Sequence, residues 1–91
     1  MISVRGATAQ ERAARVAGAL AETGALQLVL TRPDGSAQVL HARNTDLPTL
    51  ITGAPGGSRI DCDKPRARIT IHTGALHCDT NDAALIRALD G

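Results

Sequence analysis

The stretch from Ile60 to Asp79, IDCDKPRARITIHTGALHCD, decides the fold, because two short turns divide it into alternating runs. Thr73-Gly74 is typical of a two-residue hairpin turn, in which glycine supplies the positive φ. Lys64-Pro65 marks the other turn, so the stretch predicts a three-stranded antiparallel meander. The predicted register is His72 opposite Ala75, Ile71 opposite Leu76, Thr70 opposite His77, and Ile69 opposite Cys78.

Alternation along these strands sorts the side chains of the meander onto two faces. The apolar face is predicted to hold Ile60, Cys62, Ile69, Ile71, Leu76 and Cys78. The opposite face is predicted to hold Asp61, Asp63, Arg68, Thr70, His72 and His77. One face therefore needs a covering layer, and the other can meet water.

The residues before the meander predict a short strand and then a helix. Residues 2–5 alternate like a strand, and Thr8 with Glu11 has the spacing of a capping box. The helix is expected to run to about Thr23, with Gly24 as its left-handed cap. Its predicted apolar stripe is Ala13, Val16, Ala17 and Leu20.

Two further runs, 26–30 and 38–42, flank a turn at 32–36 and predict a hairpin. Leucine side chains from both runs are expected to face the helix: Leu26, Leu28, Leu30 and Leu40. Val29 and Val39 are expected to pair on the far side, where they are either covered or left exposed.

Residues 43–57 have the least regular pattern. The segment 46–51 predicts either a single helical turn capped by Asp46 or an irregular stretch that closes the sheet edge with Leu47 and Leu50. Residues 54–58 predict a flexible loop. A C-terminal helix over about 81–89 is expected to be capped within 79–81 and to bury Leu85, Ile86 and Leu89.

This order predicts one α+β domain over residues 1–91. We expect two layers: an antiparallel sheet, made of a short N-terminal strand, a hairpin and a three-stranded meander, covered by an N-terminal and a C-terminal helix. No apolar run approaches the roughly 18–20 residues of a membrane span, and no signal-peptide pattern is present. The sequence therefore indicates a cytoplasmic protein with no membrane partner.

The composition excludes several kinds of site. Of 91 residues, 43% are hydrophobic and none is Phe, Tyr or Trp. Aromatic platforms for nucleic-acid bases and aromatic interface hot spots are therefore absent. A small aliphatic core gives little stability, which favours self-association. The net charge of +1 does not by itself indicate a nucleic-acid partner.

Zinc ligand types occur in Cys62, His72, His77 and Cys78, but their spacing matches no zinc motif. The predicted register also separates the cysteines from the histidines, so no metal site is expected. The glycine-rich residues 53–58 lack the Lys-Ser/Thr pair of a phosphate-binding loop, and no other cofactor motif is present.

His72 and His77 form the one candidate polar site, since histidines on one face can act in acid–base chemistry. The predicted register places no Ser or Cys nucleophile on that face, so an enzyme using this pair is the third hypothesis. The second is a nucleic-acid-binding regulator. Its basic hairpin would contact phosphates through Arg59, Lys64, Arg66 and Arg68.

The leading hypothesis is a non-enzymatic binding or assembly module. It would act as a homo-oligomer or as an accessory subunit of a larger protein partner. The expected interaction surface consists of apolar residues that the fold leaves uncovered: Val29, Val39, Leu47 and Leu50.

Overall fold

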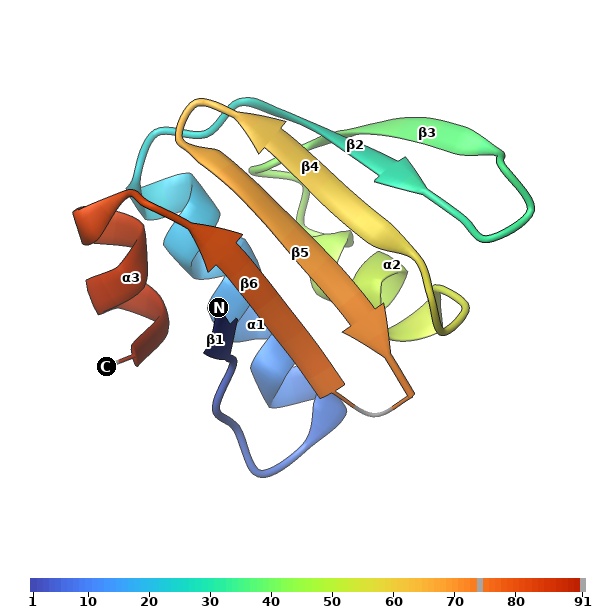
Figure 1. Ribbon diagram of the computed structural model, residues 1–91, viewed down its shortest axis with the longest axis horizontal. Helices are drawn as coiled ribbons and strands as arrows, with labels where there is room; N and C mark the ends of the chain where they lie inside the picture. The colour runs from blue at the N-terminus through green and yellow to red at the C-terminus, as the bar shows by residue number, and fades with distance from the viewer. Residues whose placement is uncertain (74, 91) are drawn as a thin grey trace.

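In the computed structural model, which describes residues 1–73 and 75–90, a six-stranded antiparallel sheet packs against three helices (Figure 1). The elements in chain order are β1 (Ile2–Ser3), α1 (Ala9–Glu22), β2 (Gln27–Thr31), β3 (Ala37–His41), α2 (Leu47–Gly53), β4 (Arg59–Asp63), β5 (Arg66–His72), β6 (Ala75–Thr80) and α3 (Ala83–Asp90). The strand order is β1-β6-β5-β4-β2-β3. The helices cover one face of the sheet, which confirms the predicted two-layer α+β fold.

The predicted register of the meander is confirmed. Across β5 and β6, His72 pairs with Ala75 and Ile69 pairs with Cys78. The predicted apolar face of the meander is buried against the helices, with each of its six side chains at most 7% exposed. Gly74, the glycine of the predicted turn, lies outside the described residues.

The first helix begins and ends as predicted. Thr8 Oγ1 accepts a hydrogen bond from the Glu11 N–H at 3.1 Å, and Gly24 has φ +86°. The buried stripe differs from the prediction, because Ala19 is buried and Ala17 is only half-buried. Helix α1 contacts both α2 and α3 beside the sheet, so the buried arc is turned relative to the predicted stripe.

The hairpin of β2 and β3 also forms as predicted. Its turn is closed by the Gly35 N–H, which donates to Arg32 O at 2.9 Å, and Gly35 has φ +89°. Leu28, Leu30 and Leu40 are buried toward the helices. The prediction for Leu26 was wrong: β2 begins at residue 27, and the Leu26 side chain is 63% exposed.

For the segment 46–51 the sequence allowed a helical turn or an irregular stretch, and the structure has a helix there, α2. Asp46 precedes this helix, but its carboxylate makes no capping hydrogen bond within the described part of the chain. Its own N–H instead donates to Asn44 Oδ1 at 2.9 Å. Leu47 is fully buried and Leu50 is half-buried, because this short helix packs against α1.

The C-terminal helix buries Leu85 and Leu89, while Ile86 is half-buried. Its cap lies one residue beyond the predicted range, because Asp82 Oδ1 accepts from the Leu85 N–H at 2.9 Å. Thr80 Oγ1 in turn accepts from the Asp82 N–H at 3.1 Å, which holds the capping residue in place. In the part of the chain that the structure describes, no helix has the length and apolarity to cross a membrane.

Candidate interaction surface on the open face of the sheet

One face of the sheet carries no helix, and we call it the open face (Figure 1). Strand pairing aligns its side chains in rows that run across the sheet. One row contains, in order, Asp79, Arg68, Asp61, Val29 and Val39. This row is therefore charged over the meander and apolar over the β2–β3 hairpin.

The apolar end of this row consists of the predicted valine pair. Val29 and Val39 lie directly opposite each other on β2 and β3, and their side chains are 39% and 66% exposed. Two β-branched side chains that meet across strands support each other, yet here one side of the pair faces solvent. The sequence left open whether Val29 and Val39 are covered or exposed, and in the structure both are exposed.

The free edge of the sheet lies beside this pair. Strand β3 is the last strand in the order and its main contacts are with β2, so its outer edge is uncovered (Figure 1). Natural edge strands usually carry a lysine, a proline or a bulge that blocks further pairing. The sequence of β3, AQVLH, has no lysine, arginine, carboxylate or proline. This edge therefore lacks the usual protection.

Two residues expected on the interaction surface do not contribute to it. Leu47 is fully buried and belongs to the core, so its prediction as an uncovered residue was wrong. Leu50 is half-buried against the same core, on the helical layer rather than on the open face. Both leucines are turned inward because 47–53 forms a helix that packs on α1.

The predicted basic residues lie close to carboxylates. Arg68 Nε donates to Asp61 Oδ1 at 2.7 Å, and Arg59 Nε lies 3.4 Å from Asp61 Oδ2. Hydrogen bonding to Asp61 and the charge of that carboxylate raise the pKa of Arg68. Asp61 thus forms ion pairs with two of the four predicted cations, Arg59 and Arg68.

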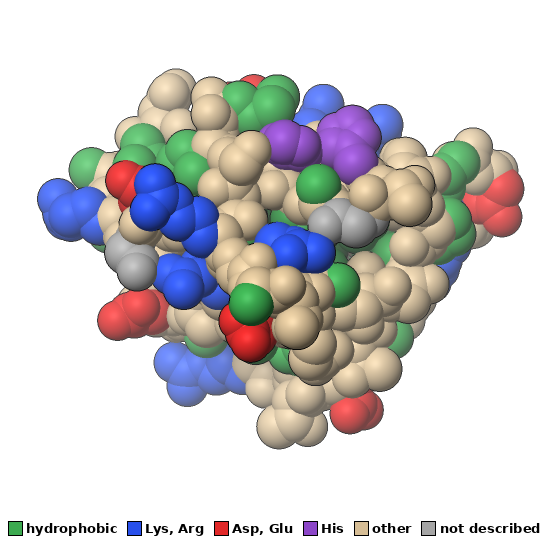
Figure 2. Space-filling model, turned by 90° about the horizontal axis from the view of Figure 1, so that it is seen from below, with side chains coloured by type: hydrophobic (Ala, Val, Ile, Leu, Met, Phe, Trp, Pro, Cys, Tyr) green, Lys and Arg blue, Asp and Glu red, His purple; other side chains and the backbone are tan. Residues whose placement is uncertain are grey.

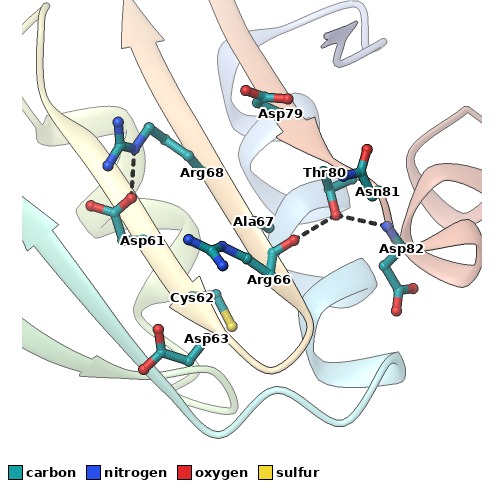
Figure 3. Close-up of a pocket in the computed structure, with 10 residues that line it drawn as sticks. All are labelled: Asp61, Cys62, Asp63, Arg66, Ala67, Arg68, Asp79, Thr80, Asn81 and Asp82. Atoms are coloured by element: carbon teal, nitrogen blue, oxygen red, sulfur yellow. Dashed lines mark hydrogen bonds and ion pairs between the residues drawn. The ribbon is translucent and has the colours of Figure 1, made fainter.

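The other two predicted cations, Lys64 and Arg66, lie at the exposed end of the β4–β5 hairpin. Beside it is an open depression of about 680 Å³, shown in Figure 3. Its charged lining is mixed, with two arginines against four aspartates: Arg66, Arg68, Asp61, Asp63, Asp79 and Asp82. A phosphate backbone prefers a continuous positive track, and this lining is mixed.

The two predicted histidines lie together on the open face. The rings of His72 and His77 meet edge to face with centroids 5.0 Å apart, and Figure 2 shows histidine side chains gathered in one group. Ser3 Oγ lies 3.1 Å from His77 Nδ1. The expectation that no serine lies on this face was therefore wrong.

Ser3 comes from β1, which pairs with β6 and places this residue directly opposite His77. The sequence signalled the strand, but it did not signal its partner, and so the contact was missed. A catalytic Ser–His pair also needs a third group that orients the imidazole. Among the described residues no carboxylate forms an ion pair or hydrogen bond with His77, and its ring also meets the His72 ring.

The two cysteines are separated from the histidines. Cys62 and Cys78 are buried on the helix-covered face, whereas His72 and His77 are on the open face. Burial raises the pKa of both thiols, and that of Cys78 to about 11. Within residues 1–73 and 75–90, no three His, Cys, Asp or Glu side chains form a group that could hold a metal ion.

The glycine-rich loop is bonded to the sheet rather than free. The Gly57 N–H donates to Ile71 O at 2.7 Å, and the Ile71 N–H donates to Ser58 O at 2.8 Å. Residues 54–58 form a loop as predicted, and these two bonds join its C-terminal end to β5. Because the Gly57 amide is already used, it is not available to bind a phosphate.

Comparison of the chain with models of protein families, with curated proteins and with solved structures gave no match. The functional argument therefore rests on the geometry of this surface.

Proposed function

We propose that this protein is a non-enzymatic assembly module that associates through the β3 edge and the exposed pair of Val29 and Val39. The observation that carries the proposal is an apolar pair beside an unprotected sheet edge. Such an edge offers unpaired main-chain groups to another strand, and the valines add apolar area to the contact. The protein would act as a homo-oligomer or as an accessory subunit of a larger protein.

The energetic reason for association is the limited core. Fully burying one valine side chain contributes about 1.5–3 kcal/mol, and folded domains are stable by only about 5–15 kcal/mol. The buried core of this chain is aliphatic, with two cysteines and without Phe, Tyr or Trp. Covering the exposed valines would therefore add a substantial fraction to the stability of each chain.

Native mass spectrometry of tag-free protein at about 1 to 100 µM tests the proposal, since this range spans weak to moderate affinities. We expect a defined oligomer for the wild type and a monomer for Val39→Lys, which places a charge on the edge strand. Ala14→Lys is the matched control, because it adds the same charge at an exposed site on α1. A monomeric wild type, or an oligomer retained in Val39→Lys, would contradict self-association through this edge.

A further inference from the structure

We infer that the occupant of the β3 edge is a second copy of this chain, paired antiparallel so that Val39 lies opposite Val39 across a two-fold axis. This inference rests on the proposed function and names the partner and the register. Homodimers with a two-fold axis are the commonest oligomers, and their interfaces use the same surface on both chains.

The hydrogen bonds of the hairpin show which main-chain groups of β3 are free. Ala42 N–H donates to Leu26 O at 2.8 Å, and Arg32 N–H donates to Ser36 O at 2.9 Å. In an antiparallel pair, hydrogen-bonded positions alternate along the strand. The even-numbered residues of β3 therefore face β2, and the main-chain groups of Ala37, Val39 and His41 point away from the sheet. Of these groups, the His41 carbonyl already accepts from the Asn44 N–H at 3.0 Å, so a second chain would share it.

Val39 is the natural centre of a two-fold pairing because it is the middle residue of Ala37–His41. With Val39 opposite its own copy, Ala37 lies opposite His41 of the second chain, and the whole strand is paired. Centring on Gln38 or Leu40 would move one end of the strand beyond its partner. The Val39 amides and carbonyls then exchange hydrogen bonds across the axis.

The open-face side chains favour the same register. Val29 already lies opposite Val39 within one chain. The pairing therefore continues the row as Val29, Val39, Val39 and Val29, which gives an apolar stripe across the axis. The strand itself carries no Asp, Glu, Lys or Arg, so two copies approach without charge repulsion along it.

The ends of the strand are complementary in charge. Asp34 lies in the turn before β3, Arg43 follows β3, and both are exposed. In the two-fold register, the turn that follows β3 in one chain, with Arg43, comes near the turn that precedes β3 in the other, with Asp34. Hydrogen bonds from Ser36 lower the pKa of Asp34, so this carboxylate is charged at neutral pH. Symmetry creates the pair twice.

Cysteine cross-linking tests the register. Val39→Cys is expected to form a covalent dimer under mild oxidation, because directly opposed Cα atoms lie about 5.5 Å apart, within the range of a disulfide. Ala37→Cys is the matched control: its two copies would lie about 13 Å apart along the strands, which prevents a disulfide. The native thiols are buried and do not compete. A mixture of Ala37→Cys and His41→Cys is expected to give the mixed dimer.

Each outcome decides between the inference and the function on which it rests. If Ala37→Cys cross-links and Val39→Cys does not, the register is wrong. If neither cross-links while the wild type is dimeric by mass and Val39→Lys is monomeric, the β3 edges pair in another arrangement, and only this inference fails. If the dimer persists in Val39→Lys, the protein assembles through another surface, and the proposed function fails as well. A monomeric wild type that does not cross-link as Val39→Cys overturns both.

A charge swap provides a second, independent test. Asp34→Arg and Arg43→Asp should each raise the dissociation constant of the dimer about two- to thirty-fold, the effect expected from two exposed ion pairs. The double variant should restore the wild-type value. A double variant weaker than both single variants would show that these residues do not meet. Thermal unfolding of each variant confirms that the chain remains folded.

Discussion

Arg68 Nε donates to Asp61 Oδ1 at 2.7 Å, across directly opposed positions of β5 and β4. The same carboxylate lies 3.4 Å from Arg59. This contact limits the positive charge that the β4–β5 hairpin can offer to a phosphate, because one half-buried aspartate pairs with two of its four cations. The charge of the open face is therefore balanced locally.

Asp61→Asn should strengthen the binding of duplex DNA and make it more sensitive to salt, because it releases Arg59 and Arg68. The affinity of the wild type should be weak at about 50 mM salt and should be lost by about 200 mM. Asp63→Asn is the matched control: it removes the same charge, but Asp63 forms no ion pair in the described part of the chain. Titrations by fluorescence anisotropy at several salt concentrations measure the difference. Equal affinities for the two variants would show that Asp61 does not mask the arginines.

Ser3 should react with a fluorophosphonate probe no faster than the exposed Ser36. The reason is that the Ser3–His77 contact has no orienting carboxylate among the described residues, so the hydroxyl is not activated. Peptide mass mapping after labelling provides the comparison. Selective modification of Ser3 that disappears in His77→Ala would instead support the enzyme hypothesis.

His72→Ala and His77→Ala should both leave the oligomeric mass unchanged.

Leu47→Ala should destabilise the protein by about 2–5 kcal/mol, because its side chain is fully buried. Leu50→Ala, the same substitution on the same short helix, should cost clearly less, because Leu50 is only half-buried. Urea unfolding monitored by circular dichroism gives both values. Equal losses would mean that α2 packs differently, with Leu50 also inside the core.

The sequence predicted the strands and the meander register because alternation and turn residues are local signals. Val29 and Val39 were paired correctly for the same reason, since Pro33 and Gly35 fix the hairpin turn. What the sequence could not show was the packing between distant elements. Leu26 alternates with buried leucines yet lies beyond the strand, and its exposure follows from where β2 begins.

The candidate site illustrates the same limit. The open-face position of His72 and His77 followed from local alternation, but the approach of Ser3 depends on β1 joining β6 at the far side of the sheet. Similarly, Leu47 could be assigned to the core only once α2 was seen against α1. Whether β3 lies at an edge of the sheet also depends on the strand order, which local patterns do not determine.

Above pH 9, the stability of the protein should fall because of Cys78. Burial raises the pKa of this thiol from 9.0 to about 11 in the folded chain. Between these values the unfolded chain loses the thiol proton while the folded chain keeps it, so the free energy of unfolding decreases as pH rises. The part of the free energy of unfolding that comes from the protonated Cys78 thiol is fully present below pH 9. It is lost as the pH approaches 11. Urea unfolding at a series of pH values measures the slope.

Cys78→Ala should flatten this pH dependence, even though it also lowers stability at neutral pH by removing a buried side chain. Cys62→Ala is the matched comparison, because it removes the other buried thiol and retains Cys78. Burial also raises the pKa of Cys62, but less than that of Cys78, so Cys62→Ala should flatten the slope less. If Cys78→Ala kept the wild-type slope between pH 9 and 11, the thiol would ionise as readily in the folded chain as in the unfolded one, and its burial against the helices would have to be revised.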